Sequence, residues 1–76
     1  MFDTRSMNGD EFIRRVQRMG RQQDVPVKFE VHRGKGSHGR LWYGNRWTTV
    51  KDRRKEIGKG LLSAMCRQLG IDKGEL

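Results

Sequence analysis

Apolar residues at helical spacing mark the first part of the chain. They recur three and four positions apart, with basic residues on the opposite side, so that Phe12, Ile13, Val16 and Met19 face away from Arg14, Arg15 and Arg18. Asn8 and Glu11 stand at the spacing of a capping box, which predicts a helix beginning at Gly9. Gly20 can adopt the left-handed conformation that ends a helix. We therefore expect an amphipathic helix with a basic outer side.

Three later segments have the pattern of strands. Residues 27–32 alternate strictly, with Val27, Phe29 and Val31 on one face and Lys28, Glu30 and His32 on the other. Extended character resumes over residues 40–43 and again over residues 46–50. Gly44 and Asn45, between these two segments, suit the positive φ values of a two-residue hairpin. We expect a half-buried strand followed by a tight β-hairpin.

The two tryptophans fall opposite each other in this hairpin. A two-residue turn pairs Trp42 with Trp47. Parity along the second strand puts His38, Arg40 and Trp42 on one face, and Leu41 and Tyr43 on the other. The favoured interpretation is that the tryptophans pack in the core beneath the helices. The alternative is that one of them forms an exposed platform on which a nucleobase stacks.

A second amphipathic helix follows a charged loop over residues 51–56. It is expected over residues 59–69, with the apolar stripe Leu61, Leu62, Met65, Cys66 and Leu69. Gly70 and Ile71 fit the end of a Schellman motif. The resulting order is α-β-β-β-α, which predicts an α+β two-layer sandwich: a three-stranded antiparallel sheet with both helices on one face. This arrangement is similar to that of double-stranded-RNA-binding domains.

A chain of 76 residues supports one core at most. We expect residues 1–6 to be a disordered N-terminal extension, residues 7–71 a single domain and residues 72–76 a C-terminal tail. The single cysteine, Cys66, has no partner for an internal disulfide and no neighbours at zinc-ligand spacing. Its expected role is that of a small buried hydrophobic residue.

The net charge of the chain indicates a domain that binds phosphate groups. Seventeen Lys and Arg against nine Asp and Glu give a formal net charge of +8. Such an excess favours nucleic acid as the partner. No apolar run approaches the roughly 18 residues of a membrane span, and no signal peptide is evident, so no membrane association and a cytoplasmic location are expected.

His38 is the candidate for chemistry. It lies in a glycine-rich stretch between two strands, where backbone can approach a phosphate and Arg33, Lys35 and Arg40 can hold it. A neutral imidazole there can take a proton from a ribose 2′-hydroxyl, or give one to the departing oxygen, without a metal. On composition alone, a surface or phosphate-contacting histidine is the more frequent case. His32 has the parity of a solvated residue.

Other chemistry is less well supported. Ser37 lacks the strand-turn-helix setting of a hydrolase nucleophile, and a hydrogen bond to backbone or phosphate is its expected role. The glycines at 34, 36 and 39 lack the helix that follows them in a dinucleotide fingerprint, so no cofactor is expected. The cluster Lys51, Arg53, Arg54, Lys55 and Lys59 precedes or begins the second helix, whose dipole would add to a phosphate site. Its alternative is a solvated loop.

Several short motifs resemble, in order and spacing, those of the HicA family of bacterial toxins, over residues 7–71. They are Met7-Asn8-Gly9-Asp10-Glu11-Phe12, Lys35-Gly36-Ser37-His38, Thr48-Thr49-Val50, Ile57-Gly58-Lys59-Gly60-Leu61-Leu62 and Gln68-Leu69-Gly70-Ile71. The resemblance implies a double-stranded-RNA-binding-like fold, metal-independent cleavage of messenger RNA that stops translation, and a HicB-type antitoxin partner. It carries the catalytic role onto His38 alone.

The sequence departs from this family in two places. Many relatives have a proline after the third strand and a histidine in the next loop, where this chain has Lys51 and then Arg53 and Arg54. No second proton-transfer residue is assigned for that reason. The link over residues 21–25 is also longer than usual.

The predicted function is an endoribonuclease toxin with His38 as general acid or base. Residues expected to bind RNA are Arg33, Lys35, Gly36, Ser37, Arg40, Lys51, Arg53, Arg54 and Lys59. A non-catalytic RNA-binding module with the same fold is the first alternative, and it would tolerate the loss of His38. A ribosome-associated or DNA-binding structural protein is less favoured, because neither basic helix lies in an evident helix-turn-helix.

Overall fold

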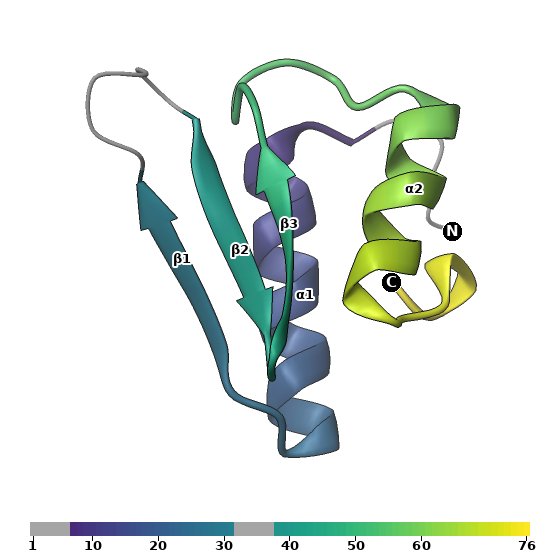
Figure 1. Ribbon diagram of the computed structural model, residues 1–76. Coiled ribbons are helices and arrows are strands. Elements are labelled where there is room, and N and C mark those ends of the chain that lie inside the picture. The colour runs from purple at the N-terminus through teal and green to yellow at the C-terminus, as the bar shows by residue number, and fades with distance from the viewer. Residues whose placement is uncertain (1–6, 32–37) are drawn as a thin grey trace.

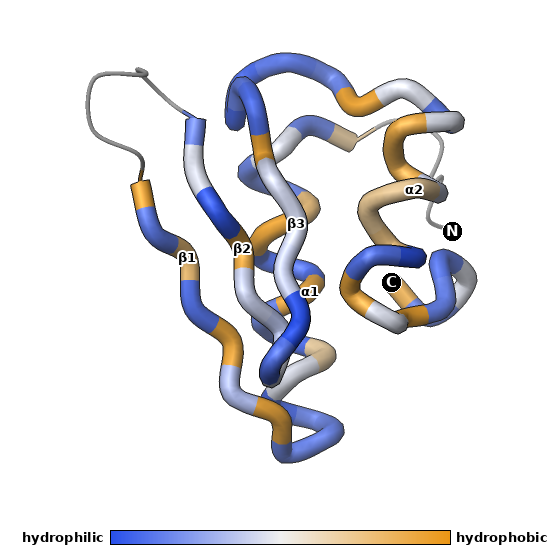
Figure 2. Tube along the Cα trace, in the orientation of Figure 1, coloured by the Kyte–Doolittle hydropathy of each residue, from blue (hydrophilic) through white to orange (hydrophobic). Residues whose placement is uncertain are grey.

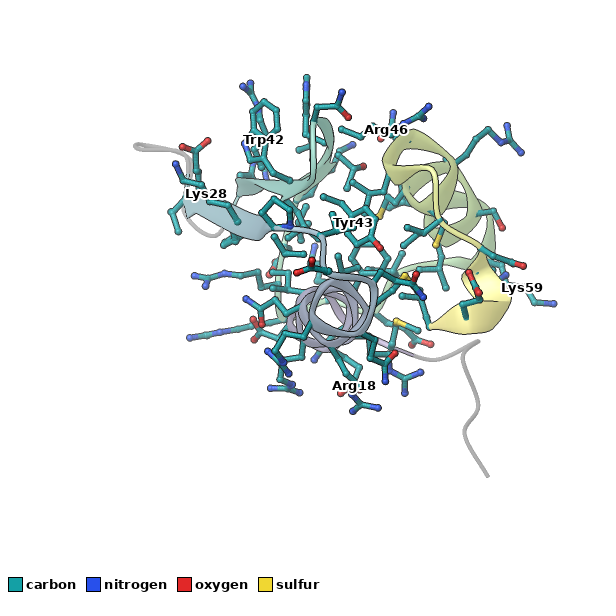
Figure 3. All side chains as sticks on the ribbon, turned by 90° about the horizontal axis from the view of Figure 1, so that it is seen from below. Arg18, Lys28, Trp42, Tyr43, Arg46 and Lys59 are labelled. Carbon is teal, nitrogen blue, oxygen red and sulfur yellow. The ribbon has the colours of Figure 1, made fainter. Side chains whose placement is uncertain are left out.

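A computed structural model describes residues 7–31 and 38–76 of the chain (Figure 1). The elements in order are α1 (Gly9–Gln23), β1 (Val27–Val31), β2 (Gly39–Tyr43), β3 (Arg46–Val50), α2 (Lys59–Leu69) and the short 3₁₀ helix η1 (Lys73–Glu75). The strands form an antiparallel sheet in the order β1-β2-β3. Both helices lie on one side of this sheet, as the view from below shows (Figure 3). The predicted α+β class and α-β-β-β-α order are confirmed.

The start of α1 is the one that the sequence predicted. The side-chain oxygen Oδ1 of Asn8 accepts a hydrogen bond from the backbone N–H of Glu11 at 2.8 Å, and the helix begins at Gly9. The Glu11 carboxylate in turn accepts hydrogen bonds from Arg15 at 2.9 Å and Arg14 at 3.1 Å. These hydrogen bonds, the one from Arg15 first, hold the pKa of Glu11 below its ordinary value. The first turn is therefore fixed by its own side chains.

Removing this cap should destabilise the domain measurably. We expect Asn8→Ala to lower the free energy of unfolding by about 1 kcal/mol, because one helix-start N–H loses its acceptor. Urea denaturation followed by circular dichroism measures the change. Asn8→Ser keeps an accepting oxygen and should stay within a few tenths of a kcal/mol of the parent. Equal losses in the two variants would show that the Asn8 side chain does not act as a cap.

The end of α1 differs from the prediction. The helix continues past Gly20 to Gln23, and Asp24 adopts the left-handed conformation at φ 58°. Gly20 is instead a site of close packing: a Cβ there would collide with Val27 and would lie 2.7 Å from the Val25 carbonyl oxygen. The glycine thus lets the start of β1 pack on the helix. The left-handed residue that ends α1 is instead Asp24, a residue type that tolerates this conformation.

One apolar core lies between the helices and the sheet. Its largest fully buried side chains are Phe12, Val16, Leu41, Val50, Leu62 and Leu69. Hydropathy alternates along β1 and within both helices, so each element turns one side to this core (Figure 2). Cys66 is buried there as expected, and burial raises the pKa of its thiol. Thr48, also buried, donates its hydroxyl to the Gln68 side-chain oxygen and joins β3 to α2.

The hairpin register is confirmed, but the favoured place for the tryptophans is wrong. Trp42 pairs with Trp47 across a two-residue turn in which Gly44 has φ 64°, while no positive φ occurs at Asn45. Leu41 is fully buried beneath the helices, so its neighbour Trp42 must project from the opposite face. Trp47 is accordingly 43% exposed. Both rings lie on the face of the sheet that no helix covers.

The C-terminal end of α2 follows the predicted pattern. Gly70 is left-handed at φ 72°, and the backbone N–H groups of Gly70 and Ile71 donate to Arg67 and Cys66 at 3.1 and 3.0 Å. Beyond it η1 forms, and Leu76 packs against the core. Leu61, expected in the apolar stripe of α2, is 48% exposed. Residues 1–6 and His32, for which a disordered extension and a strand position were predicted, lie outside the described residues.

Candidate functional site

His38 stands at the end of the sheet where β2 begins and β3 ends. Gly39 pairs with Val50, so His38 lies one residue beyond the last pair, next to the loop that leaves β3. Its side chain is exposed and lines a pocket of about 340 Å³. The other lining residues come from β3, the loop and α2: Val50, Lys51, Asp52, Lys55, Glu56, Ile57, Leu61 and Met65. Neither tryptophan belongs to this pocket, although sequence parity placed both on the side of His38.

The loop that forms the pocket wall is tied to the start of α1. The N–H of Asp10 donates to the Arg53 carbonyl at 2.9 Å, and the N–H of Ile57 donates to the Met7 carbonyl at 2.8 Å. Gly9 permits this approach, since a Cβ there would lie 2.7 Å from the Arg53 Cα. This loop, for which the sequence favoured a phosphate site and left a solvated loop as the alternative, is therefore held in place by backbone hydrogen bonds.

The pocket combines cations, carboxylates and an apolar wall. Two lysines, Lys51 and Lys55, and two acidic residues, Asp52 and Glu56, line the pocket together with His38. The N-terminus of α2 carries no side-chain cap and no acidic residue in its first turn, so its positive end is available to an anion. A phosphate could be bound here with an imidazole beside it.

Sequence reasoning missed the two carboxylates of this pocket. No motif placed an acid near His38, because Asp52 and Glu56 come from a loop distant in sequence. The register of β2 on β3 carried the only signal. It pairs Gly39 with Val50, so the residue before Gly39 and the residues after Val50 leave the sheet at the same end.

The residues predicted to bind RNA do not form one cluster. Lys51 lines the pocket of His38, whereas Arg54 and Lys59 are exposed but are not among its lining residues. Arg40 lies on the helix-free face of the sheet, with its guanidinium carbon 4.2 Å from the centre of the Trp47 ring. The rest of the predicted set, Arg33, Lys35, Gly36 and Ser37, lies outside the described residues.

Arg53 turns inward from the loop. Its guanidinium carbon lies 5.5 Å from the centre of the Phe29 ring, and its Nε is buried without a hydrogen-bond partner. Phe29 also covers Gly39, since a Cβ on Gly39 would collide with that ring. Arg53 therefore packs beneath the strand end that carries His38, a position that a run of charged residues could not predict.

Two features are absent from the described parts of the chain. Within residues 7–31 and 38–76, no three or more His, Cys, Asp or Glu side chains are grouped so that they could hold a metal ion. Over the same residues, neither helix has the length and apolar character needed to cross a membrane.

This fold and site define a class: a small, strongly basic α+β domain with a histidine and two lysines in a pocket at one end of the sheet. The family model described as "HicA toxin of bacterial toxin-antitoxin" matches residues 9–71, from the first residue of α1 to just beyond α2. The chain belongs to the HicA family of bacterial toxin components. No curated protein and no solved structure matches it.

Proposed function

We propose that this toxin is a metal-independent endoribonuclease that cleaves messenger RNA in the cytoplasm and so blocks translation. The observation that carries the proposal is the exposed His38 in one pocket with Lys51 and Lys55. The ammonium groups can bind the scissile phosphate, and the imidazole can move a proton at neutral pH. Membership of the HicA family supports the toxin role.

The reaction uses a nucleophile supplied by the substrate. The ribose 2′-oxygen attacks the adjacent phosphorus, and the bond from phosphorus to the 5′-oxygen breaks, which leaves a 2′,3′-cyclic phosphate and a 5′-hydroxyl. His38 either accepts the proton of the 2′-hydroxyl or donates one to the leaving 5′-oxygen, and a water molecule carries out the other proton transfer. Lys51 and Lys55 stabilise the charge that develops on the phosphoryl oxygens. No redox change and no cofactor is involved.

The partners of this activity are RNA and an antitoxin. The exposed Arg54 and Lys59, together with Arg33, Lys35, Gly36 and Ser37 of the strand connection, extend the phosphate contacts along the RNA backbone. A HicB-type antitoxin would silence the toxin by covering the His38 pocket. The half-exposed Leu61 at the pocket rim offers it an apolar contact.

The chemistry of the substrate tests this proposal. Purified protein in excess EDTA should cleave a single-stranded RNA and leave the same sequence with 2′-O-methyl riboses intact, because the methyl group removes the attacking hydroxyl. Gel electrophoresis of end-labelled strands measures both, and the cyclic phosphate identifies the product. Cleavage of the methylated strand would refute the mechanism. Salt-dependent binding of RNA without any cleavage would favour the non-catalytic RNA-binding module.

A further inference from the structure

The helix-free face of the sheet carries an ordered aromatic surface, which we call the open face. It comprises alternate residues of the three strands: Lys28, Glu30, Arg40, Trp42, Trp47 and Thr49. In Figure 3, Trp42 and Lys28 project on the opposite side of the molecule from Arg18 of α1. This face contributes nothing to the core, so its two large aromatic side chains have no role in the packing of the helices.

Polar neighbours hold the tryptophans in place on the open face. The two rings lie 6.2 Å apart between centroids, tilted by 46°. The indole N–H of Trp42 donates to the Glu30 carboxylate at 3.0 Å, and Lys28 pairs with the other carboxylate oxygen at 3.0 Å. The hydrogen bonds from Lys28 and Trp42 keep the pKa of Glu30 below its ordinary value, so this carboxylate stays ionised. The ammonium group of Lys28 balances its charge. The aromatic pair is thus preorganised although it faces solvent.

Arg40 adds a cation whose hydrogen-bond donors remain available. Its guanidinium lies over the Trp47 ring at 4.2 Å, a cation–π geometry that uses the flat face of the group. Within residues 7–31 and 38–76 its side chain makes no hydrogen bond and no close ion pair, and Glu30, which pairs with it on β1, interacts with it only through charge. The N–H donors around its rim can therefore take a phosphate in the bidentate manner typical of arginine.

A groove beside Trp42 completes the surface. It has a volume of about 310 Å³ and is lined by Pro26, Lys28, Glu30, Trp42 and Gly44. Binding pockets for small ligands begin at roughly 300 Å³, so the groove has room for a nucleobase-sized ring. An aromatic pair, a guanidinium with unused hydrogen-bond donors and a groove are together the elements with which proteins bind unpaired nucleotides.

We propose that the open face binds single-stranded RNA, with a nucleobase stacked against the Trp42–Trp47 pair and a phosphate on Arg40. This inference rests on the proposed ribonuclease function and names its substrate class. Arg40 lies in β2 two residues after His38, which directly precedes that strand, so an RNA strand that crosses the pocket of His38 can continue onto the open face. A duplex keeps its bases stacked inside and offers none to the tryptophans.

Intrinsic fluorescence reports this contact directly. The chain has two tryptophans, and both lie on the open face, so their emission has no contribution from elsewhere. The probe is a 2′-O-methyl single strand of about ten nucleotides, within the range that single-strand sites cover and resistant to cleavage. Its addition should quench the emission, whereas the same strand paired to its complement should bind without quenching. Unchanged emission on binding of the single strand would overturn the proposal.

Two substitutions locate the contact. Trp47→Ala should weaken binding of the single strand by about 5- to 160-fold, since loss of a base-stacking ring has that effect. Trp47→Phe, which keeps a ring, should lie between this variant and the parent, and circular dichroism verifies that both fold. Arg40→Gln should weaken binding and reduce its salt dependence by about one phosphate contact. The matched control Arg18→Gln removes a charge from another exposed arginine, on the opposite side of the molecule, and should bind as the parent does.

The outcomes separate this inference from the proposed function. Cleavage of RNA without quenching, or with parental affinity in Trp47→Ala, would leave the nuclease standing and refute the open face as an RNA site. Quenching without cleavage would refute the nuclease and keep the open face. Quenching by an antitoxin but not by RNA would make this face a protein interface, and the proposal would be wrong.

Discussion

Replacement of His38 by alanine should lower the rate of RNA cleavage by a factor of about 10² to 10⁴, the usual loss when a proton-transfer group is removed. The domain should remain folded, because the His38 side chain is exposed and precedes β2 instead of packing in the core. Exposed substitutions of this kind usually change the free energy of unfolding by no more than about 0.5 kcal/mol. Single-turnover cleavage of an end-labelled RNA, with protein in excess, measures the chemical step.

Two controls make the His38 experiment specific. His32→Ala removes the other histidine of the chain and should cleave at close to the parental rate. The fluorescence of Trp42 and Trp47 should still respond to single-stranded RNA in His38→Ala, because the open face is unchanged. If folded His38→Ala protein cleaves RNA as fast as the parent, His38 is not catalytic, and the RNA-binding module becomes the better account of this chain.

The elements themselves could be read from the sequence because their signals are local. Asn8 caps α1, Gly70 ends α2, and the Gly44-Asn45 pair sets the register of β2 on β3. Each depends on residues within one turn of the chain, where capping and turn geometry decide the outcome. The strands came from alternation of apolar and polar residues, which is equally local.

The two predictions that were wrong, the place of the tryptophans and the end of α1, depended on tertiary packing. Parity correctly separated Trp42 from Leu41, but both faces of the hairpin carry apolar residues, so the pattern could not say which face the helices cover. Gly20 looked like a helix end because glycine is common there. Its actual reason is the close approach of Val27, which no local rule contains.

Of the residues around the pocket, the sequence singled out His38 as the candidate for chemistry and did not predict its surroundings. The glycine-rich stretch singled out His38, whereas it is the structure that brings Lys51 into the same pocket. The direction of each neighbouring cation was not predictable, because a run of charged residues has no periodicity to assign faces. Arg53 packs inward on Phe29, and Arg40 lies on the open face. These two cations, which were expected beside a phosphate at His38, therefore do not line its pocket.

Substitution of Gly39 by alanine should destabilise the domain by about 1–3 kcal/mol, the range found for overpacked interiors. A Cβ on this buried residue would collide with the Phe29 ring and would lie 2.7 Å from the Glu30 carbonyl oxygen. The carbonyl belongs to the backbone of β1, so no side-chain rotation relieves the contact, and the pairing of β1 with β2 must shift. Because Gly39 directly follows His38, that shift also displaces the pocket, and RNA cleavage should fall with stability.

Gly60→Ala is the matched control, since the same methyl group is added where there is room for it. No atom lies within 4 Å of a Cβ at Gly60, which is exposed in the first turn of α2. Alanine there restricts the unfolded chain and suits a helix, so the free energy of unfolding should rise by about 0.4–1 kcal/mol. Urea denaturation of both variants and the parent measures the two free energies of unfolding, which should change in opposite directions. A Gly39→Ala variant as stable as Gly60→Ala would mean that β1 and β2 do not approach at Gly39 as closely as the structure has them, and that the strand end carrying His38 is not held by Phe29.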